Sequence, residues 1–258
     1  MIDNLTAVRL QVDGHIALVT MDNPPVNAQS RALSEEMAAV FDWISDTADI
    51  RVAVLTGQGR VFCAGADLKR RGDLESPGAL PQHSRRTREC FHAIRECAKP
   101  VIAAVNGPAL GAGLAIVASC DILVASEKAS IGLPEIDVGL LGGCRHAMRL
   151  FSHSRVRRML LTGFRVPGEE LYRLGVAEAC VPPEELMPTA MRLAQEIASK
   201  APLATRMAKH TANTIEDMSL RDGYRYEQDM TATIAKTEDA KEAQRAFAEK
   251  RPPVFHGR

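Results

Sequence analysis

Hydrophobic residues in the first two-thirds of the chain follow two alternating patterns. Short apolar runs predict strands at residues 16–22, 52–57, 101–107 and 121–126, and three of these runs are nearly continuous. Such runs are typical of strands buried on both faces, as in α/β folds. Between them, apolar residues at helical spacing predict two helices, the second ended by Pro100: Leu33, Met37, Val40, Phe41 and Ile44, then Phe91, Ile94 and Ala98.

The pattern changes after about Pro182. Leu186, Ala190, Leu193 and Ile197 form one helical stripe, and the rest of the chain to about Lys250 is rich in Ala, Glu, Lys, Arg and Met without any strand pattern. We therefore expect an α/β core over residues 1–200, followed by a helical segment over residues 201–258.

Composition narrows the class of protein. Of the 258 residues, 46% are hydrophobic, which is enough for a large core, and the 32 basic residues balance the 32 acidic ones. This balance argues against a nucleic-acid or acidic membrane partner. The six cysteines show neither a C-x-x-C pair nor metal-ligand spacing, so we expect reduced thiols, no metal and a cytoplasmic protein. No leader pattern or membrane-length apolar run is visible in the sequence.

Two loops share one plan, in "VAVLTGQGRVFCAGADLKR" and "VIAAVNGPALGAGLA". In each, an apolar strand ends in glycine and small residues lead into an expected helix, near Asp67 and near Gly111. The first N–H groups of a helix lack internal partners and carry a positive partial charge. Two such ends could hold one oxygen that becomes negative, forming an oxyanion hole. Taken alone, the two loops are better explained as ordinary tight strand-to-helix turns with glycine for packing.

Other glycine-loop chemistries are not supported. The glycine pairs at 57 and 59 and at 111 and 113 are followed by Phe62 and Ile116 where a dinucleotide loop needs a third glycine. The chain contains neither a G-x-x-x-x-G-K-[ST] phosphate loop nor a G-x-S-x-G nucleophile turn. Dinucleotide, nucleotide and serine-hydrolase functions therefore lose support.

Several segments together resemble the enoyl-CoA hydratase/isomerase, or crotonase, family, in that family's order: "FCAGADLK", "KPVIAAVNGPALGAGLAIVASCDILVASEKASIGLPEIDVGL", "MLLTGFRVPGEEL", "LGVAEACVP" and "FAEKRPPVF". The resemblance implies an α/β crotonase (ClpP-like) superhelical core of ββα turns with a C-terminal α-helical oligomerisation segment. It also implies a homotrimer or homohexamer, an acyl-CoA thioester substrate and no separate cofactor, since coenzyme A is part of the substrate.

By the same resemblance, the N–H groups of Ala66 and Ala112 hold the thioester oxygen while an enolate forms. Ala112 replaces the commoner glycine but keeps the N–H group. Lys250 falls where the family often has a lysine near the nucleotide, although a solvated helix-end cation is an equal alternative. The remaining positions expected to bind the substrate are Val26, Ala28, Ala64, Asp67, Leu68, Leu110, Gly111, Pro134 and Gly143.

One catalytic carboxylate of the family's hydratases is missing. Those enzymes carry two glutamates, and here the first position holds Ala115 whereas the second is Glu135. Apolar neighbours should raise the pKa of Glu135, which suits proton transfer near neutral pH. Hydration most simply uses two groups, but one base can move a double bond by removing a proton at C2 and returning it at C4. The sequence therefore favours Δ3-Δ2 enoyl-CoA isomerisation with Glu135 as the single base, with 2-enoyl-CoA hydration as the alternative.

A second departure from the family is "GGCRHAMRL", which stands where a proline and small residues are common. His146 could act as a second acid or base and restore hydration, or it could face solvent or a subunit contact. Arg145 could pair with a carboxylate on the acyl chain or with an acid of the fold. We expect Cys144 and Asp137 to be structural. A non-catalytic acyl-CoA-binding or RNA-binding homologue is a further alternative, against which the charge balance and the retained Glu135 argue.

Overall fold

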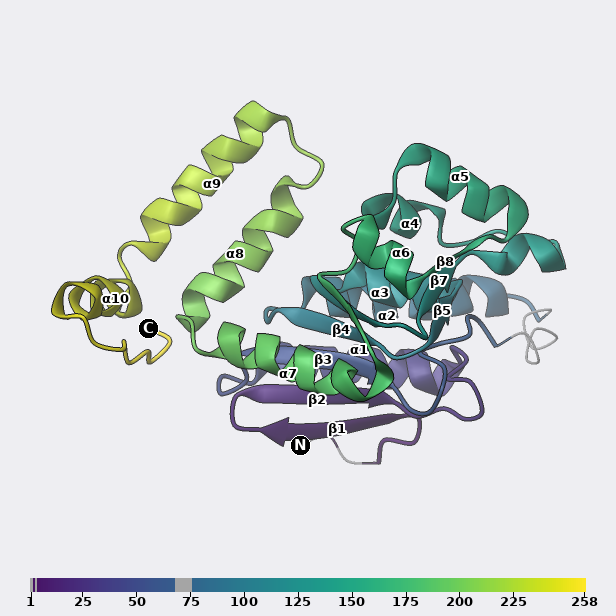
Figure 1. The fold of residues 1–258 in the computed structure, drawn as a ribbon, viewed down its shortest axis with the longest axis horizontal. Coiled ribbons are helices and arrows are strands. Elements are labelled where there is room, and N and C mark those ends of the chain that lie inside the picture. The colour runs from purple at the N-terminus through teal and green to yellow at the C-terminus, as the bar shows by residue number, and fades with distance from the viewer. Residues whose placement is uncertain (1, 3, 68–75) are drawn as a thin grey trace.

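A mixed sheet of six strands forms the centre of the molecule in the computed structural model, which describes residues 2, 4–67 and 76–258 (Figure 1). The strand order is β1-β2-β3-β4-β6-β9; β1 pairs antiparallel with β2 and all other neighbours are parallel. The bounds are β1 Val8–Asp13, β2 Ile16–Met21, β3 Val52–Gly57, β4 Val101–Val105, β6 Ile122–Ser126 and β9 Ala179–Val181. The four predicted strands are confirmed as β2, β3, β4 and β6.

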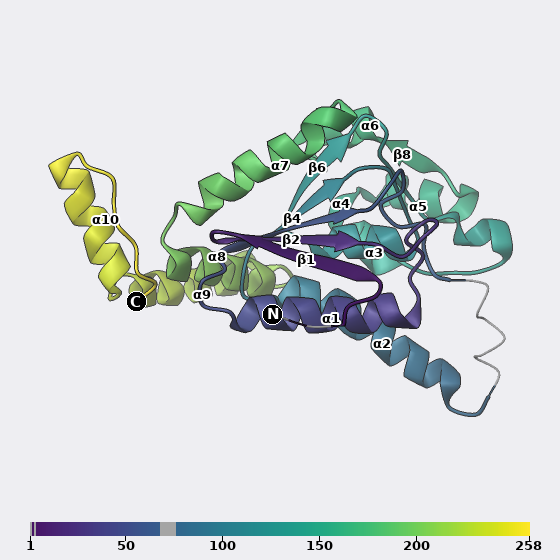
Figure 2. The same cartoon turned by 90° about the horizontal axis from the view of Figure 1, so that it is seen from below.

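Helices cover both faces of this sheet, because alternate residues of its central strands point to opposite sides (Figure 2). Val52, Val54 and Ile102 pack with α7 (Pro183–Ala198) on one face. Ala53, Leu55 and their neighbours pack on the other face with α1 (Arg31–Asp46), α2 (Ala79–Glu96) and α3 (Ala112–Ser119). The two predicted helices of the first half are confirmed as α1 and α2, although α2 ends two residues before Ala98.

A second, smaller sheet consists of three short strands. Its order is β5-β7-β8, with β5 parallel to β7 and β7 antiparallel to β8. These strands have three residues each, too few to produce a recognisable hydrophobic period, so the sequence did not predict them. The bounds of this region are β5 Pro108–Leu110, β7 Ser130–Gly132, the 3₁₀ helix η2 Pro134–Val138, α4 Cys144–Leu150, α5 His153–Thr162, β8 Arg165–Pro167 and α6 Gly168–Arg173.

The last part of the chain is helical, as predicted, and extends away from the sheet (Figure 1). It contains α8 (Pro202–Ile215), α9 (Leu220–Ile234) and α10 (Glu238–Glu249). Lys209 attaches α8 to the core: its Nζ lies 2.9 Å from Asp121 Oδ2 and donates to the carbonyls of Ile94 and Lys99 at 3.2 and 3.0 Å. Among the described residues, no helix is both long and apolar enough to span a membrane.

Candidate active site

The two glycine loops lie against each other through direct backbone contacts. Cys63 N donates to Pro108 O at 3.1 Å, and Leu110 N donates to Cys63 O at 2.9 Å. A β-carbon at Gly113 would overlap Cys63 O and lie 3.0 Å from Cys63 Cβ, so only glycine permits this approach. The sequence predicted two loops of one design, and the structure brings them together.

Each loop presents a backbone N–H group without an acceptor. Gln29 N donates to Gly65 O at 2.7 Å and Asp67 N donates to Gln29 O at 3.2 Å, so the N–H of Ala66 between them points away from Gln29. Ala112 is the first residue of α3. Within residues 2, 4–67 and 76–258, neither the Ala66 nor the Ala112 N–H donates to any acceptor. These are two donors that a ligand oxygen could satisfy.

The two loops differ in whether a helix follows directly. The second loop leads into α3 as predicted, with Gly111 as the residue before its first turn. In the first loop, Asp67 is not helical, and the next described helix is α2, which begins at Ala79. Glycine spacing could not separate these cases, because it predicts a tight turn and not the length of chain that follows.

A cavity of about 640 Å³ opens beside these donors. Of the predicted site residues it contains Ala66, Asp67, Gly111, Ala112, Glu135, Gly143 and His146 in its lining, together with Ala115. Val26, Ala28, Ala64, Leu110 and Pro134 are not part of the lining. Leu68 lies outside the described residues.

Glu135 lies in the first turn of η2, and its carboxylate reaches Gly111. Gly111 has a φ of 55°, and a β-carbon there would lie 3.2 Å from Glu135 Cδ and still closer to Oε1. Glu135 Oε2 is buried and accepts no hydrogen bond from the described residues. Burial raises the pKa of Glu135, because the charged form loses its hydration. The site thus contains a carboxylate prepared to accept and return a proton.

Ala115 and His146 occupy the other two positions that decide the chemistry. Ala115 is only 2% exposed and contributes a methyl group to the cavity. The His146 ring packs edge-on against Phe91, with 5.0 Å between the ring centroids. Burial, and then the nearby Arg149 guanidinium, lowers the pKa of His146, so the ring is neutral near pH 7. A neutral imidazole can accept a proton.

Two predicted residues lie elsewhere. Arg145 points away from the cavity and pairs with Asp217 at 2.9 Å, on side chains that are both mostly exposed. The sequence left open whether Arg145 pairs with a carboxylate of the acyl chain or with an acidic residue of the protein, and the structure shows the second. Lys250 caps α10, which lies at the far end of the molecule from α3 and α4 (Figure 1).

The sequence missed several residues of the cavity wall. Gln29 stands directly after Ala28 in the loop that the sequence singled out, and Thr87 and Phe91 come from α2. Phe91 was predicted only as part of a helical stripe. Gln29 and Thr87 gave no signal, because their importance depends on what packs around them.

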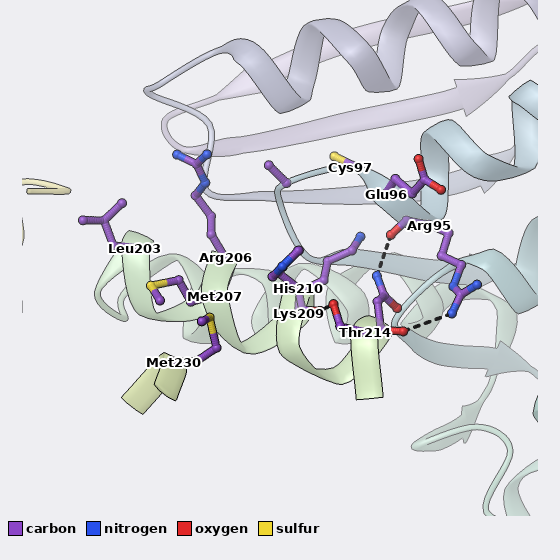
Figure 3. A pocket seen from close by; sticks show the side chains of 12 residues that line it. Arg95, Glu96, Cys97, Leu203, Arg206, Met207, Lys209, His210, Thr214 and Met230 are labelled. Atoms are coloured by element: carbon purple, nitrogen blue, oxygen red, sulfur yellow. Dashed lines mark hydrogen bonds between the residues drawn. The ribbon is translucent and has the colours of Figure 1, made fainter. Parts of the chain in front are cut away.

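A second cavity, of about 590 Å³, lies where α2 ends against α8 (Figure 3). It contains none of the predicted site residues. Two of its charged groups have partners in the fold: Lys209 pairs with Asp121 and Arg95 with Glu216. We interpret this cavity as a junction between the core and the C-terminal helices. Among the described residues, no group of three or more His, Cys, Asp or Glu side chains could hold a metal.

Solved structures define the fold class. An enoyl-CoA hydratase from Bacillus anthracis superimposes with a TM-score of 0.93 at 31% identity, covering 98% of this chain and all of the other. An enoyl-CoA hydratase from Geobacillus kaustophilus gives a TM-score of 0.91 at 33% identity, over 98% of this chain and 99% of that one. These similarities confirm the α/β crotonase fold that the sequence predicted.

Sequence relatives define the family. The sequence model of the enoyl-CoA hydratase/isomerase family matches residues 11–258. The chain is 35% identical over 249 residues to a Dictyostelium discoideum protein named "Probable enoyl-CoA hydratase, mitochondrial", covering 95% of this chain and 89% of the relative. It is 37% identical over 255 residues to the carnitinyl-CoA dehydratase of Citrobacter koseri, covering 95% and 96%. The chain belongs to the enoyl-CoA hydratase/isomerase family and is an enzyme of it, which argues against the non-catalytic alternative.

Proposed function

We propose that this enzyme isomerises 3-enoyl-CoA thioesters to 2-enoyl-CoA thioesters, with Glu135 as its single base. The observation that carries the proposal is the contrast between two positions of one cavity. Glu135 supplies a buried carboxylate with an unpartnered oxygen, whereas Ala115 offers only a methyl group. One base with no fixed partner suits a reaction that takes a proton from one carbon and returns it to another.

In the proposed reaction, the thioester oxygen accepts hydrogen bonds from the N–H groups of Ala66 and Ala112. Glu135 removes a proton from C2, and the electrons of the broken C–H bond spread into a dienolate whose charge rests on the thioester oxygen. Glu135 then returns the proton at C4, which shifts the double bond to C2–C3 and restores the carboxylate. Two N–H donors aimed at the developing charge supply the main electrostatic stabilisation.

Hydration of 2-enoyl-CoA is the second candidate, supported by two observations. The relatives described above are named hydratase and dehydratase, and His146 lines the cavity as a neutral ring. In this alternative, Glu135 works with His146, or alone, to activate water and protonate C2.

Liquid chromatography coupled to mass spectrometry separates the two reactions, because isomerisation gives a new peak of unchanged mass and hydration adds the mass of one water. We expect purified protein to convert a short 3-enoyl-CoA without change of mass and to hydrate the 2-enoyl isomer slowly. Replacing Ala115→Glu supplies the missing second carboxylate and should raise hydration by about 10²–10⁴-fold. His146→Ala should have little effect on isomerisation. Fast hydration by the wild type that is lost in His146→Ala would favour the second candidate.

The remaining substrate contacts are also proposals. We propose that Val26, Ala28 and Ala64, which adjoin the cavity wall through the bond from Ala64 N to Val26 O, contact coenzyme A, which enters as part of the substrate with no separate cofactor. Lys250 lies away from this cavity, so a nucleotide contact by Lys250 would require another subunit.

A homotrimer or homohexamer is the assembly that we propose. Leu220, at the start of α9, is 91% exposed and Phe247, on α10, is 88% exposed, and such apolar side chains favour a subunit contact. Light scattering should give a mass of three or six chains at micromolar concentration, and a monomer would contradict the proposal. We further propose a cytoplasmic location, which the six free cysteines support.

A further inference from the structure

Unpartnered polar atoms gather in the cavity of the candidate active site. In the described part of the chain, four buried side-chain nitrogen or oxygen atoms have no hydrogen-bond partner: Gln29 Nε2, Thr87 Oγ1, Arg95 Nε and Glu135 Oε2. Three of the four belong to residues that line this one cavity. Burying a polar group without a partner costs free energy, so buried polar groups nearly always have partners. The cluster indicates that a bound ligand supplies the missing hydrogen-bond partners. The proposed reaction explains the unpartnered oxygen of Glu135, but it does not explain the unpartnered atoms of Gln29 and Thr87.

Gln29 is fixed beside the proposed oxyanion hole. Its residue is 3% exposed, and its backbone pairs with Gly65 and Asp67 on either side of Ala66. The side chain lies next to the Cys90 thiol, whose pKa burial raises to about 12, so this neighbour is a neutral and weak partner. Among the described residues, the Gln29 amide therefore has nothing better than this weak contact with a thiol, although it is held firmly in place.

Thr87 lacks a hydrogen bond that several other threonines of the described helices make. Five threonines in helices or at their ends donate to the carbonyl four residues earlier, at 2.6–3.0 Å: Thr47, Thr162, Thr214, Thr231 and Thr233. Thr87 has the carbonyl of His83 in the same relation within α2 but makes no such bond. Thr87 lines the cavity, so a group bound there could supply the partner that its buried hydroxyl lacks among the described residues.

The charges around the cavity favour a neutral partner for these two groups. Arg31 and Arg86 also line the cavity, but both guanidinium groups lie 2.9 Å from Glu35 Oε1. A carboxylate held by the neutral Gln29 and Thr87 would share the cavity with the buried Glu135 carboxylate, which is unfavourable. A hydroxyl group can accept from the Gln29 amide and either donate to or accept from the Thr87 hydroxyl.

We propose that Gln29 and Thr87 form a subsite for a hydroxyl group on the acyl chain, so that the preferred substrates are hydroxylated acyl-CoA thioesters. The inference rests on the proposed acyl-CoA site. Under that chemistry Glu135 and the two N–H donors serve C1 to C4, which assigns the hydroxyl to a carbon beyond C4.

The test is a binding experiment that needs no turnover. Isothermal titration calorimetry of the whole protein would compare hexanoyl-CoA with its 5-hydroxy, 6-hydroxy and ω-carboxy derivatives. The wild type should bind one hydroxylated probe at least about 10-fold more tightly than hexanoyl-CoA. In Thr87→Val and in Gln29→Leu this ratio should fall toward one. Thr162→Val, which removes a threonine hydroxyl on α5 outside the cavity, should keep the wild-type ratio.

Melting temperature gives an independent readout. Because the Thr87 hydroxyl has no hydrogen-bond partner among the described residues, Thr87→Val should not lower Tm, whereas loss of a structural hydrogen bond would lower it. Equal affinity for plain and hydroxylated probes, preference for the carboxylate probe, or a large fall in Tm for Thr87→Val would each overturn the proposal. Proton exchange at C2 reports the proposed function separately, so that function can stand when the subsite fails, and the reverse.

Discussion

Replacing Gly111→Ala should disable the enzyme by moving its base. The new β-carbon would lie 3.2 Å from Glu135 Cδ and closer still to Oε1. To reach ordinary contact distance, the carboxylate oxygen must retreat by about 1 Å, and a displacement of that size in a catalytic group can cost about 10²-fold in rate. The φ of 55° at Gly111 adds strain, since a side chain at such a position costs about 1–3 kcal/mol.

Gly14→Ala is the matched control, because it separates strain from displacement. Gly14 has the same φ of 55°, in the turn between β1 and β2, but a β-carbon there would meet no atom within 4 Å. Both variants should therefore lose stability, by roughly 2–4 °C in Tm for each kcal/mol of strain. Only Gly111→Ala should lose activity.

Hydrogen–deuterium exchange at C2 of a saturated acyl-CoA, followed by mass spectrometry in D₂O, measures the base directly. We expect Gly14→Ala to exchange at the wild-type rate and Gly111→Ala to exchange about 10²-fold more slowly at a temperature where both are folded. Equal exchange rates in the two variants would refute the close contact between Gly111 and Glu135 as the reason for glycine at this position.

Three further predictions follow from the same site. Ala112→Pro removes one N–H donor at the first position of α3, where helices tolerate proline. It should lower acyl-CoA turnover by about 10²–10³-fold with the fold intact. Unchanged turnover in a folded variant would show that this N–H is not used. Because burial raises the pKa of Glu135 and the base must be charged, the pH–rate profile should fall on its acid side at a pH above the ordinary value for glutamate, and an acid limb at or below that value would be inconsistent with the burial. Because the pKa of Glu135 is raised, the folded state binds this proton more tightly than the unfolded chain does, and the charged carboxylate therefore costs stability at neutral pH. Glu135→Gln should accordingly show a Tm equal to or above that of the wild type in a thermal melt at pH 7.

The sequence predicted those parts of the structure that local chemistry determines. Short apolar runs, three of them nearly continuous, marked β2, β3, β4 and β6, since a strand buried on both faces is mostly apolar. The two glycine loops were predicted to share one plan, and the structure places them against each other, with Gly113 packed on Cys63. Glu135 could be named because its segment resembles the one that carries the second glutamate of the family's hydratases, and its apolar neighbours predicted a raised pKa.

What the sequence could not predict depends on contacts between distant residues. The strands β5, β7 and β8 are too short for a hydrophobic period and form only because they pair with one another. Arg145 had two kinds of possible partner, and only the folded chain brings it to Asp217, in the loop between α8 and α9. Thr87 looks like any helical threonine until the missing bond to His83 is seen.

The most direct test of the account is isomerisation of a short 3-enoyl-CoA by Glu135→Gln, measured beside Asp137→Asn. Asp137 is an exposed acid two residues further along η2 that does not line the cavity, so it controls for removing a charge from the same turn. We expect Glu135→Gln to bind the substrate but to lose at least about 10²-fold in isomerisation and in C2 exchange, while Asp137→Asn behaves as the wild type. Isomerisation by Glu135→Gln within a few-fold of the wild-type rate would contradict the assignment of Glu135 as the base.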